Sequence, residues 1–241
     1  MILLIIFLNY LLFYFSYWVL ASWILFFILF YWIIYLIVRS WDKIIPTQSQ
    51  NFQREFLYTT LNFIMYFLIV FLLFLAFQYG WIKLWFWSGV YILPLIFLYI
   101  IFHDLYFYIL HRFLHLKWCL RHIHYIHHQS HISSVWTSYS FHPLEWFMYT
   151  WVVVIFFFFP LNIFALLASV LYNDFLTILW HSWKENFSPK VLKRNKVFQY
   201  IATPTYHDLH HSHSKWNYWL YFLYLDKYFD TYDKKHKDII S

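Results

Sequence analysis

Long apolar stretches restrict what this chain can fold into. Residues 1–38 and 56–82 contain no charged side chain, residues 90–102 are apolar, and residues 146–172 are again uncharged. Roughly 20 consecutive apolar residues cross a bilayer core as a helix, and lipid-exposed backbone is satisfied only in helices and closed barrels. Charged residues make up 12% of this chain, against roughly 25% in a soluble domain. The sequence therefore predicts an all-α, integral, multi-pass membrane protein.

Two helical hairpins are predicted, at about residues 56–110 and 144–180. The two glycines of the chain mark the turn of the first hairpin, and Pro160 marks the turn of the second. At a rise of ~1.5 Å per residue, each arm of the second hairpin is about 22–30 Å long. Because a hairpin returns the chain to the side that it left, we expect residues 111–143 and 181–241 to form a helical cap at one membrane face.

Residues 1–55 are expected to be a membrane anchor followed by a loop, and residues 56–241 a catalytic domain. The first apolar stretch has no basic segment before it and no small-residue cleavage site after it, so we predict a retained anchor rather than a signal peptide. It is too long for one upright span and lacks a glycine or proline turn, which favours one tilted or broken helix.

The net charge of +6 comes largely from basic residues near the ends of the apolar stretches, among them Arg112, Lys117 and Arg121. Basic residues beside membrane spans indicate a cytoplasmic orientation, and they also suit contact with anionic lipid headgroups. We therefore expect this end of the protein on the cytoplasmic side, and no nucleic-acid partner.

Eight histidines fall into three short clusters. The spacing is H-x3-H in the first and H-x2-HH in the other two: His111 and His115; His124, His127 and His128; His207, His210 and His211. Residues three and four apart share one face of a helix, so each cluster can direct its rings to one point. Neutral imidazole is a preferred ligand of iron, zinc and copper. These clusters offer more nitrogens than one tetrahedral ion accepts, which predicts a polynuclear site.

Other metal centres fit the residues less well. The three glutamates are not followed by histidine three residues later, which excludes the Glu-x-x-His sites of soluble di-iron proteins. No H-E-x-x-H occurs, which argues against a zincin, and a haem would leave six histidines unexplained. The alternative is that the histidines line a wet interface, but each buried unsatisfied polar group costs on the order of 1–3 kcal/mol. Cys119, the single cysteine, is expected to be a small buried residue.

Five motifs follow one another in the second half of the chain: H-D-L-Y-F-Y-I-L-H-R-F-L-H (103–115), H-Y-I-H-H (124–128), F-H-P-L-E (141–145), H-S (181–182) and T-P-T-Y-H-D-L-H-H-S (203–212). In order and spacing they resemble the fatty acid hydroxylase/sterol desaturase superfamily, whose members are integral membrane non-haem di-iron oxidases. The resemblance extends from about His103 to Tyr232.

The resemblance implies that two iron ions are bound by nine histidines: His111, His115, His124, His127, His128, His181, His207, His210 and His211. Asp104 and Asp208 are expected to orient ligand imidazoles, although Asp208 also suits a helix start. His142 and Glu145 match a family motif, and a role in tying the cap to the membrane helices is favoured over metal binding. Thr203 followed by Pro204 predicts the start of a helix.

The chain departs from the family pattern near its end. The family usually shows Asn-Tyr-Gly and Phe-Gly-Thr, whereas here Trp219 follows Asn-Tyr and Asp230 lies between Phe and Thr. Replacing both glycines removes backbone freedom and adds bulk near the end where we expect the substrate. These departures leave the identity of the substrate open.

The function implied is an O2-dependent oxidase that hydroxylates or desaturates an unactivated C–H bond of a lipid, such as a sterol or fatty acyl chain. The sequence has no flavin or nicotinamide fingerprint, so electrons are expected from an external cytochrome b5-like or ferredoxin-type protein. Two alternatives stay open: an ether-lipid-cleaving monooxygenase of the same superfamily, and a catalytically silent metal-binding membrane scaffold.

Overall fold

The computed structural model describes most of the chain from residue 51 onward. The described residues are 51–85, 89–131, 133–156, 161–181, 185 and 200–233, with residues 21, 25, 28, 29 and 32 of the N-terminal region, which are helical. The predicted membrane anchor at residues 1–55 therefore lies largely outside the described residues.

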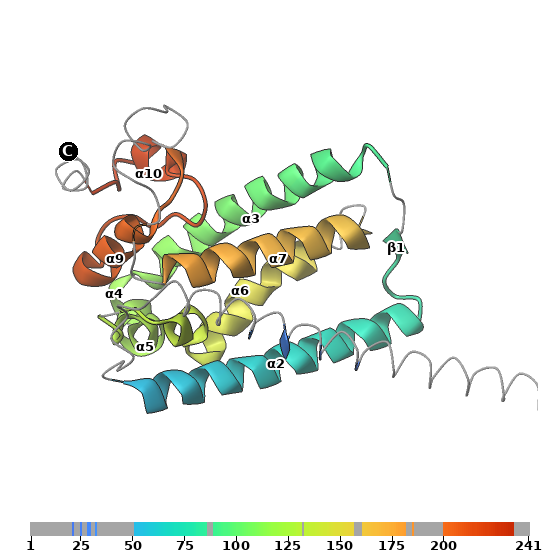
Figure 1. The fold of residues 1–241 in the computed structure, drawn as a ribbon, viewed down its shortest axis with the longest axis horizontal. Coiled ribbons are helices and arrows are strands. Elements are labelled where there is room, and N and C mark those ends of the chain that lie inside the picture. The colour runs from blue at the N-terminus through green and yellow to red at the C-terminus, as the bar shows by residue number, and fades with distance from the viewer. Residues whose placement is uncertain are drawn as a thin grey trace, which may run out of the picture.

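Four long helices run alongside one another (Figure 1): α2 (Phe52–Gln78), α3 (Ile92–Leu114), α6 (Pro143–Phe156) and α7 (Ile163–Trp180). By length and composition α2, α3 and α7 are suited to cross a membrane. Helix α6 has 14 residues, which is ~21 Å of helix against a hydrocarbon core of ~30 Å. This agrees with a predominantly helical membrane protein.

The connections at the far end of the long helices pair with each other. Two-residue strands β1 (Leu84–Trp85) and β2 (Leu161–Asn162) lie parallel, with Leu84 opposite Leu161. The pairing covers two residues of each connection, whose backbone groups need partners where no helix provides them. The described part of the chain is therefore mostly helical, as expected. Asn162 also caps α7, since its side chain accepts hydrogen bonds from the N–H groups of the first turn.

The long helices bury few of their side chains against one another. Helix α3 packs against both α6 and α7, with Tyr99, Val152 and Ala165 forming the buried contact. In contrast, α2 exposes much of its apolar surface, and Leu72 is 61% exposed. Exposed apolar patches of this extent mark an interaction surface, and for helices of this length and hydropathy that surface suits lipid.

Short helices gather at the end of the bundle opposite β1, and α4, α5, α9 and α10 are labelled there in Figure 1. They are α4 (Lys117–Cys119), the π-helical turn η1 (Leu120–His124), α5 (Tyr125–His128), the 3₁₀ turn η2 (Val135–Tyr139), α9 (Pro204–His213) and α10 (Tyr224–Tyr228). They fall in the ranges expected for the helical cap. The predicted start of α9 is confirmed, with Thr203 as N-cap and proline in the first turn.

Candidate metal centre

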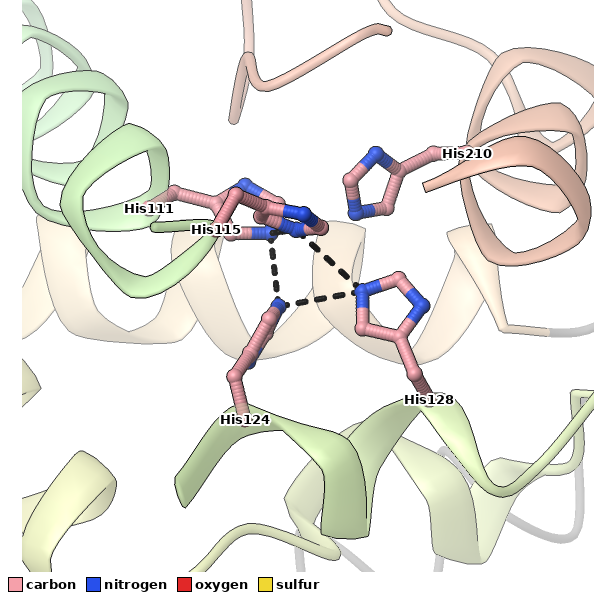
Figure 2. A group of neighbouring side chains, drawn as sticks. All are labelled: His111, His115, His124, His128 and His210. Carbon is pink, nitrogen blue, oxygen red and sulfur yellow. Dashed lines mark hydrogen bonds between the residues drawn. The ribbon is translucent and has the colours of Figure 1, made fainter. Parts of the chain in front are cut away.

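Nine histidines converge at this end of the bundle in two groups. The nitrogen atoms that each group offers to an ion lie within 4.8 Å of one another. The first group has five members, which Figure 2 shows pointing toward one another: His111, His115, His124, His128 and His210. The second has four: His127, His181, His207 and His211. All are buried except His115, which is half-buried. The structure thus brings together every histidine that the sequence predicted as a ligand.

Each H-x2-HH motif contributes to both groups, in a reciprocal way. His124 and His128 enter the first group while His127 enters the second; His207 and His211 enter the second while His210 enters the first. The reason is local geometry, because residues four apart share a helix face whereas consecutive side chains diverge by about 100°. The π-helical turn that ends at His124 is a local widening of the kind often found at functional sites.

The groups are in contact with each other. The ring centroids of His128 and His211, one from each group, lie 5.0 Å apart. Those of His127 and His211, both in the second group, lie 4.6 Å apart. This arrangement suits two neighbouring ions rather than two independent sites.

Four Nε2 atoms of the first group form a closed ring of short contacts. His124 Nε2 lies 3.1 Å from the Nε2 atoms of both His111 and His128, and His115 Nε2 lies 3.3 Å from the same two atoms. Two nitrogens each ~2.1 Å from one ion, the usual metal–imidazole distance, and at right angles to each other would be about 3.0 Å apart. The spacing therefore fits a shared ion.

The opposite nitrogens of several rings are hydrogen-bonded to acceptors. Nδ1 of His111 lies 3.0 Å from the carbonyl oxygen of Tyr218, and Nδ1 of His210 lies 2.6 Å from that of Trp216. Nδ1 of His124 lies 2.6 Å from Glu145 Oε1. A carbonyl or carboxylate oxygen only accepts, so Nδ1 carries the proton in each ring, and in neutral imidazole Nε2 is then a bare lone pair.

These tautomers make the centre unfavourable without a cation. His111 and His124 turn lone pairs toward each other at 3.1 Å, and the buried Nε2 of His210 has no hydrogen-bond partner. A buried acceptor without a partner costs on the order of 1–3 kcal/mol. A metal ion among these nitrogens removes both penalties, so the residues present fit a metal.

In the second group, His181 shows the same arrangement. Nδ1 of His181 lies 2.7 Å from the carbonyl oxygen of Thr177, one turn earlier in α7, and Nε2 of His181 lies 2.8 Å from Nε2 of His207. His207 Nε2 in turn lies 3.1 Å from Nε2 of His211. His181, just after the end of α7, is thereby directed to the same point as His207 and His211 of α9.

Burial keeps these rings in the form that binds metal. Desolvation lowers the pKa of His181 and of His210 to about 4, and desolvation together with neighbouring histidines lowers the pKa of His124, His127 and His207 well below the usual value. At neutral pH the imidazoles are therefore uncharged, as ligation requires.

We predicted that Asp104 orients a ligand imidazole, but its hydrogen bonds go to the backbone. Its Oδ1 accepts hydrogen bonds from the backbone N–H groups of Tyr221 (2.7 Å) and Phe222 (3.4 Å). The helical position of Asp104, seven residues before His111, is as expected, but the C-terminal segment lies against that face of α3 and offers its own donors. The expectation of direct orientation is corrected: Asp104 holds a segment whose carbonyl groups orient the rings.

The other three supporting residues lie close to the histidines in sequence or in space. Glu145 is fully buried and contacts His124 directly. Nδ1 of His142 accepts a hydrogen bond from the backbone N–H of Leu144 at the start of α6, and His142 is in neither histidine group. Asp208 is half-buried in α9 beside His207. Cys119 is buried and is also in neither group.

Sequence reasoning missed a second layer of support. Asp226 is fully buried and accepts hydrogen bonds from the backbone N–H groups of Tyr218 and Trp219 and from the Thr231 hydroxyl. It thereby positions the Tyr218 carbonyl, which accepts from His111. Every residue has a carbonyl group, so the sequence gives no signal that the Tyr218 carbonyl orients His111. The closest signal in the sequence is Asp226, an aspartate shortly after the Asn-Tyr pair at 217–218.

A protein-family model described as fatty acid hydroxylase matches residues 96–231, more than half of the chain. The chain belongs to the fatty acid hydroxylase family. Comparison with curated proteins and with solved structures gave no match. The matched range contains both histidine groups of this fatty acid hydroxylase family member. The match confirms the resemblance seen in the motifs. Proteins of the family are generally oxidoreductases that hydroxylate or desaturate lipids and are typically iron-dependent.

Proposed function

We propose that the protein is a membrane-bound, O2-dependent oxidase that hydroxylates or desaturates an unactivated C–H bond of a lipid. The observation that carries this proposal is the pair of adjacent histidine groups, five and four in number, with lone pairs directed inward. Family membership supports the same class of reaction.

In this proposal each histidine group holds one iron ion. Imidazole nitrogen suits iron as well as zinc and copper, and redox-inactive zinc does not activate O2. Bound iron would supply the one-electron and oxygen chemistry that no side chain provides. The electrons would come from an external protein of the cytochrome b5-like or ferredoxin type, and we place the site on the cytoplasmic side as the basic residues predict.

The protein's own residues would hold and shield this centre. Acceptors behind His111, His124 and His210 keep each ring in one tautomer, which raises the basicity of the ligand nitrogen. Burial of the groups excludes water, while the half-buried His115 marks the more open side. Apolar helix surfaces next to the centre suit a lipid chain, whose position relative to the ions would decide which carbon reacts.

The first experiment measures iron in the purified full-length protein. We expect about two ions per chain, and a loss on His124→Ala. The matched control is His122→Ala, because His122 is exposed, lies two residues away, and hydrogen-bonds only locally to the Trp118 carbonyl. Fewer than one iron per chain in the unaltered protein, with no change in His124→Ala, would refute the proposal.

The second experiment compares the lipids of aerobic cells that express the unaltered protein or His124→Ala. A new hydroxylated or desaturated lipid only with the unaltered protein supports the proposal and names the substrate. Cleavage of an ether lipid would instead identify the alternative monooxygenase. If the protein binds iron but the lipids are the same in both kinds of cell, also when cytochrome b5-like and ferredoxin-type electron donors are co-expressed, the silent scaffold is favoured.

A further inference from the structure

The chain that links α3 to the second histidine motif has two chemically different faces. From Lys117 to His128 it is continuously helical through α4, η1 and α5. The inner face is buried and carries Cys119, Ile123, His124, His127 and His128. The outer face is exposed and carries Trp118, Arg121, His122 and Tyr125, spaced three, four and seven residues apart, with Lys117 beside them. We call these five exposed residues the outer face.

The outer face lies where a spanning helix ends. Helix α3 has 23 residues, or ~34 Å at ~1.5 Å per residue, which slightly exceeds the ~30 Å hydrocarbon core. Leu116 then adopts an extended conformation, with ψ of 140°, and redirects the chain. In Figure 1 the long helices run across the view whereas α5 is seen nearly end-on. The helical segment therefore leaves α3 at the depth of the lipid headgroups and turns away from its axis.

The aromatic side chains of the outer face suit that depth. Trp118 is 64% exposed and Tyr125 is 53% exposed, although both are large and apolar over most of their surface. Tryptophan and tyrosine are enriched at the membrane–water boundary, where the ring meets lipid and the polar atom meets water. Leu116 and Phe113, also exposed, extend this apolar surface back toward α3.

The cations of the outer face have no acidic partner within the described part of the chain. Neither Lys117 nor Arg121 forms an ion pair with a described carboxylate. Arg112, one turn earlier, is different, because it lies over the rings of Tyr108 and Phe229. Two cations without an acidic partner among the described residues, next to interfacial aromatic side chains, match a phosphate group by charge and by depth.

We propose that the outer face binds the phosphate groups of anionic phospholipids in the surrounding membrane. The same helical segment carries His124, His127 and His128 on its inner face, so headgroup contact on one side fixes the depth of the histidine groups on the other. The proposal requires only that α3 spans the membrane, and it stands independently of the reaction that the histidines support.

The test is native mass spectrometry of the full-length protein in detergent, with equimolar phosphatidylglycerol and phosphatidylcholine of identical acyl chains. We expect the unaltered protein to retain phosphatidylglycerol preferentially. Each cation near an anionic surface contributes about fivefold to binding, so Arg121→Gln should lower the phosphatidylglycerol-to-phosphatidylcholine ratio about fivefold. Adding Lys117→Gln should lower the ratio roughly 25-fold in total.

Lys83→Gln is the matched control, since Lys83 is exposed beside the exposed Trp81 at the opposite end of the helices but has no second basic residue within four positions of it. It should leave the ratio unchanged. Circular dichroism and gel filtration establish whether each variant is folded. If the double variant does not fold, Arg121→Gln alone tests the proposal. Equal retention of both lipids by the unaltered protein, an unchanged ratio in folded Arg121→Gln, or an equal fall in Lys83→Gln would each overturn the proposal.

Discussion

Glu145 Oε1 accepts a hydrogen bond from His124 Nδ1 at 2.6 Å, and both side chains are fully buried. Glu145 lies in the first turn of α6, whereas His124 ends the π-helical turn after α3. One contact therefore joins a long helix to the histidine centre and sets the tautomer of a ring within it. The sequence motif predicted that Glu145 ties the cap to the membrane helices. The hydrogen bond adds that Glu145 sets the tautomer of His124.

Replacing Glu145 by glutamine should weaken iron binding by about 10–100-fold, the usual effect of altering the residue that accepts a hydrogen bond from the second ring nitrogen of a ligand histidine. The amide still accepts a hydrogen bond but has no charge to favour the Nδ1–H tautomer. Iron dissociation measured with a competing chelator would test this. The control is Glu55→Gln, a buried glutamate that accepts hydrogen bonds from Ser130 and Ser134 instead; equal weakening in both variants would contradict the assigned role.

Replacing Asp226 by asparagine should lower stability by about 2 kcal/mol, since hydrogen bonds to a charged group contribute roughly 1.5–3 kcal/mol. Three donors point at this carboxylate, and an amide N–H would oppose one of them. The Tyr218 carbonyl should then shift away from His111, so iron content should fall together with the thermal midpoint. Asp230→Asn, four residues away at an exposed position, should change neither; an unaltered iron content in Asp226→Asn would rule out the link to His111.

Acid should destabilise the metal-free protein. Burial lowers the pKa of His181 and His210 from 6.5 to about 4, so between pH 4 and 6.5 the unfolded chain binds more protons than the folded one. Their contribution to stability is complete above pH 6.5 and is lost as pH falls toward 4, at about 1.4 kcal/mol per pH unit for each such histidine. Thermal midpoints of chelator-treated protein from pH 7.5 to 4.5 would show this, and His210→Gln should reduce the slope. An unchanged slope in His210→Gln would contradict the buried neutral state of this ring.

Asp230 stands where the family pattern has glycine, and its φ is +51°. Trp219, the other replaced glycine, is not among the described residues with positive φ, so only one of the two departures costs backbone strain. A left-handed conformation costs a residue with a Cβ roughly 1–2 kcal/mol. Asp230→Gly should therefore be more stable than Asp230→Ala by about 1 kcal/mol, as measured by chemical unfolding. Equal stabilities would show that the backbone relaxes at this position.

Local patterns in the sequence predicted the elements that carry the centre. Apolar length predicted α2, α3 and α7 as spans because each depends on its own composition. The spacing of His207, His210 and His211 predicted a helix, and the Thr203–Pro204 start predicted where it begins. The expectation that all three rings share one point was wrong, because His210 enters the other group. Each of these predictions depends on residues within one helix or directly beside it, so no knowledge of distant contacts was needed.

The sequence by itself determined that eight histidines of helical spacing form three clusters next to apolar segments, and the family resemblance added His181. Only the tertiary structure decided which of them lie in the same group, because the division into five and four depends on how the ends of α3, α5, α7 and α9 meet. It also decided that Asp104 holds the Tyr221 backbone rather than a ring, and that the Tyr218 and Trp216 carbonyls orient His111 and His210. The physical reason is that carbonyl acceptors occur at every residue, so their partners depend on which segments the fold brings together.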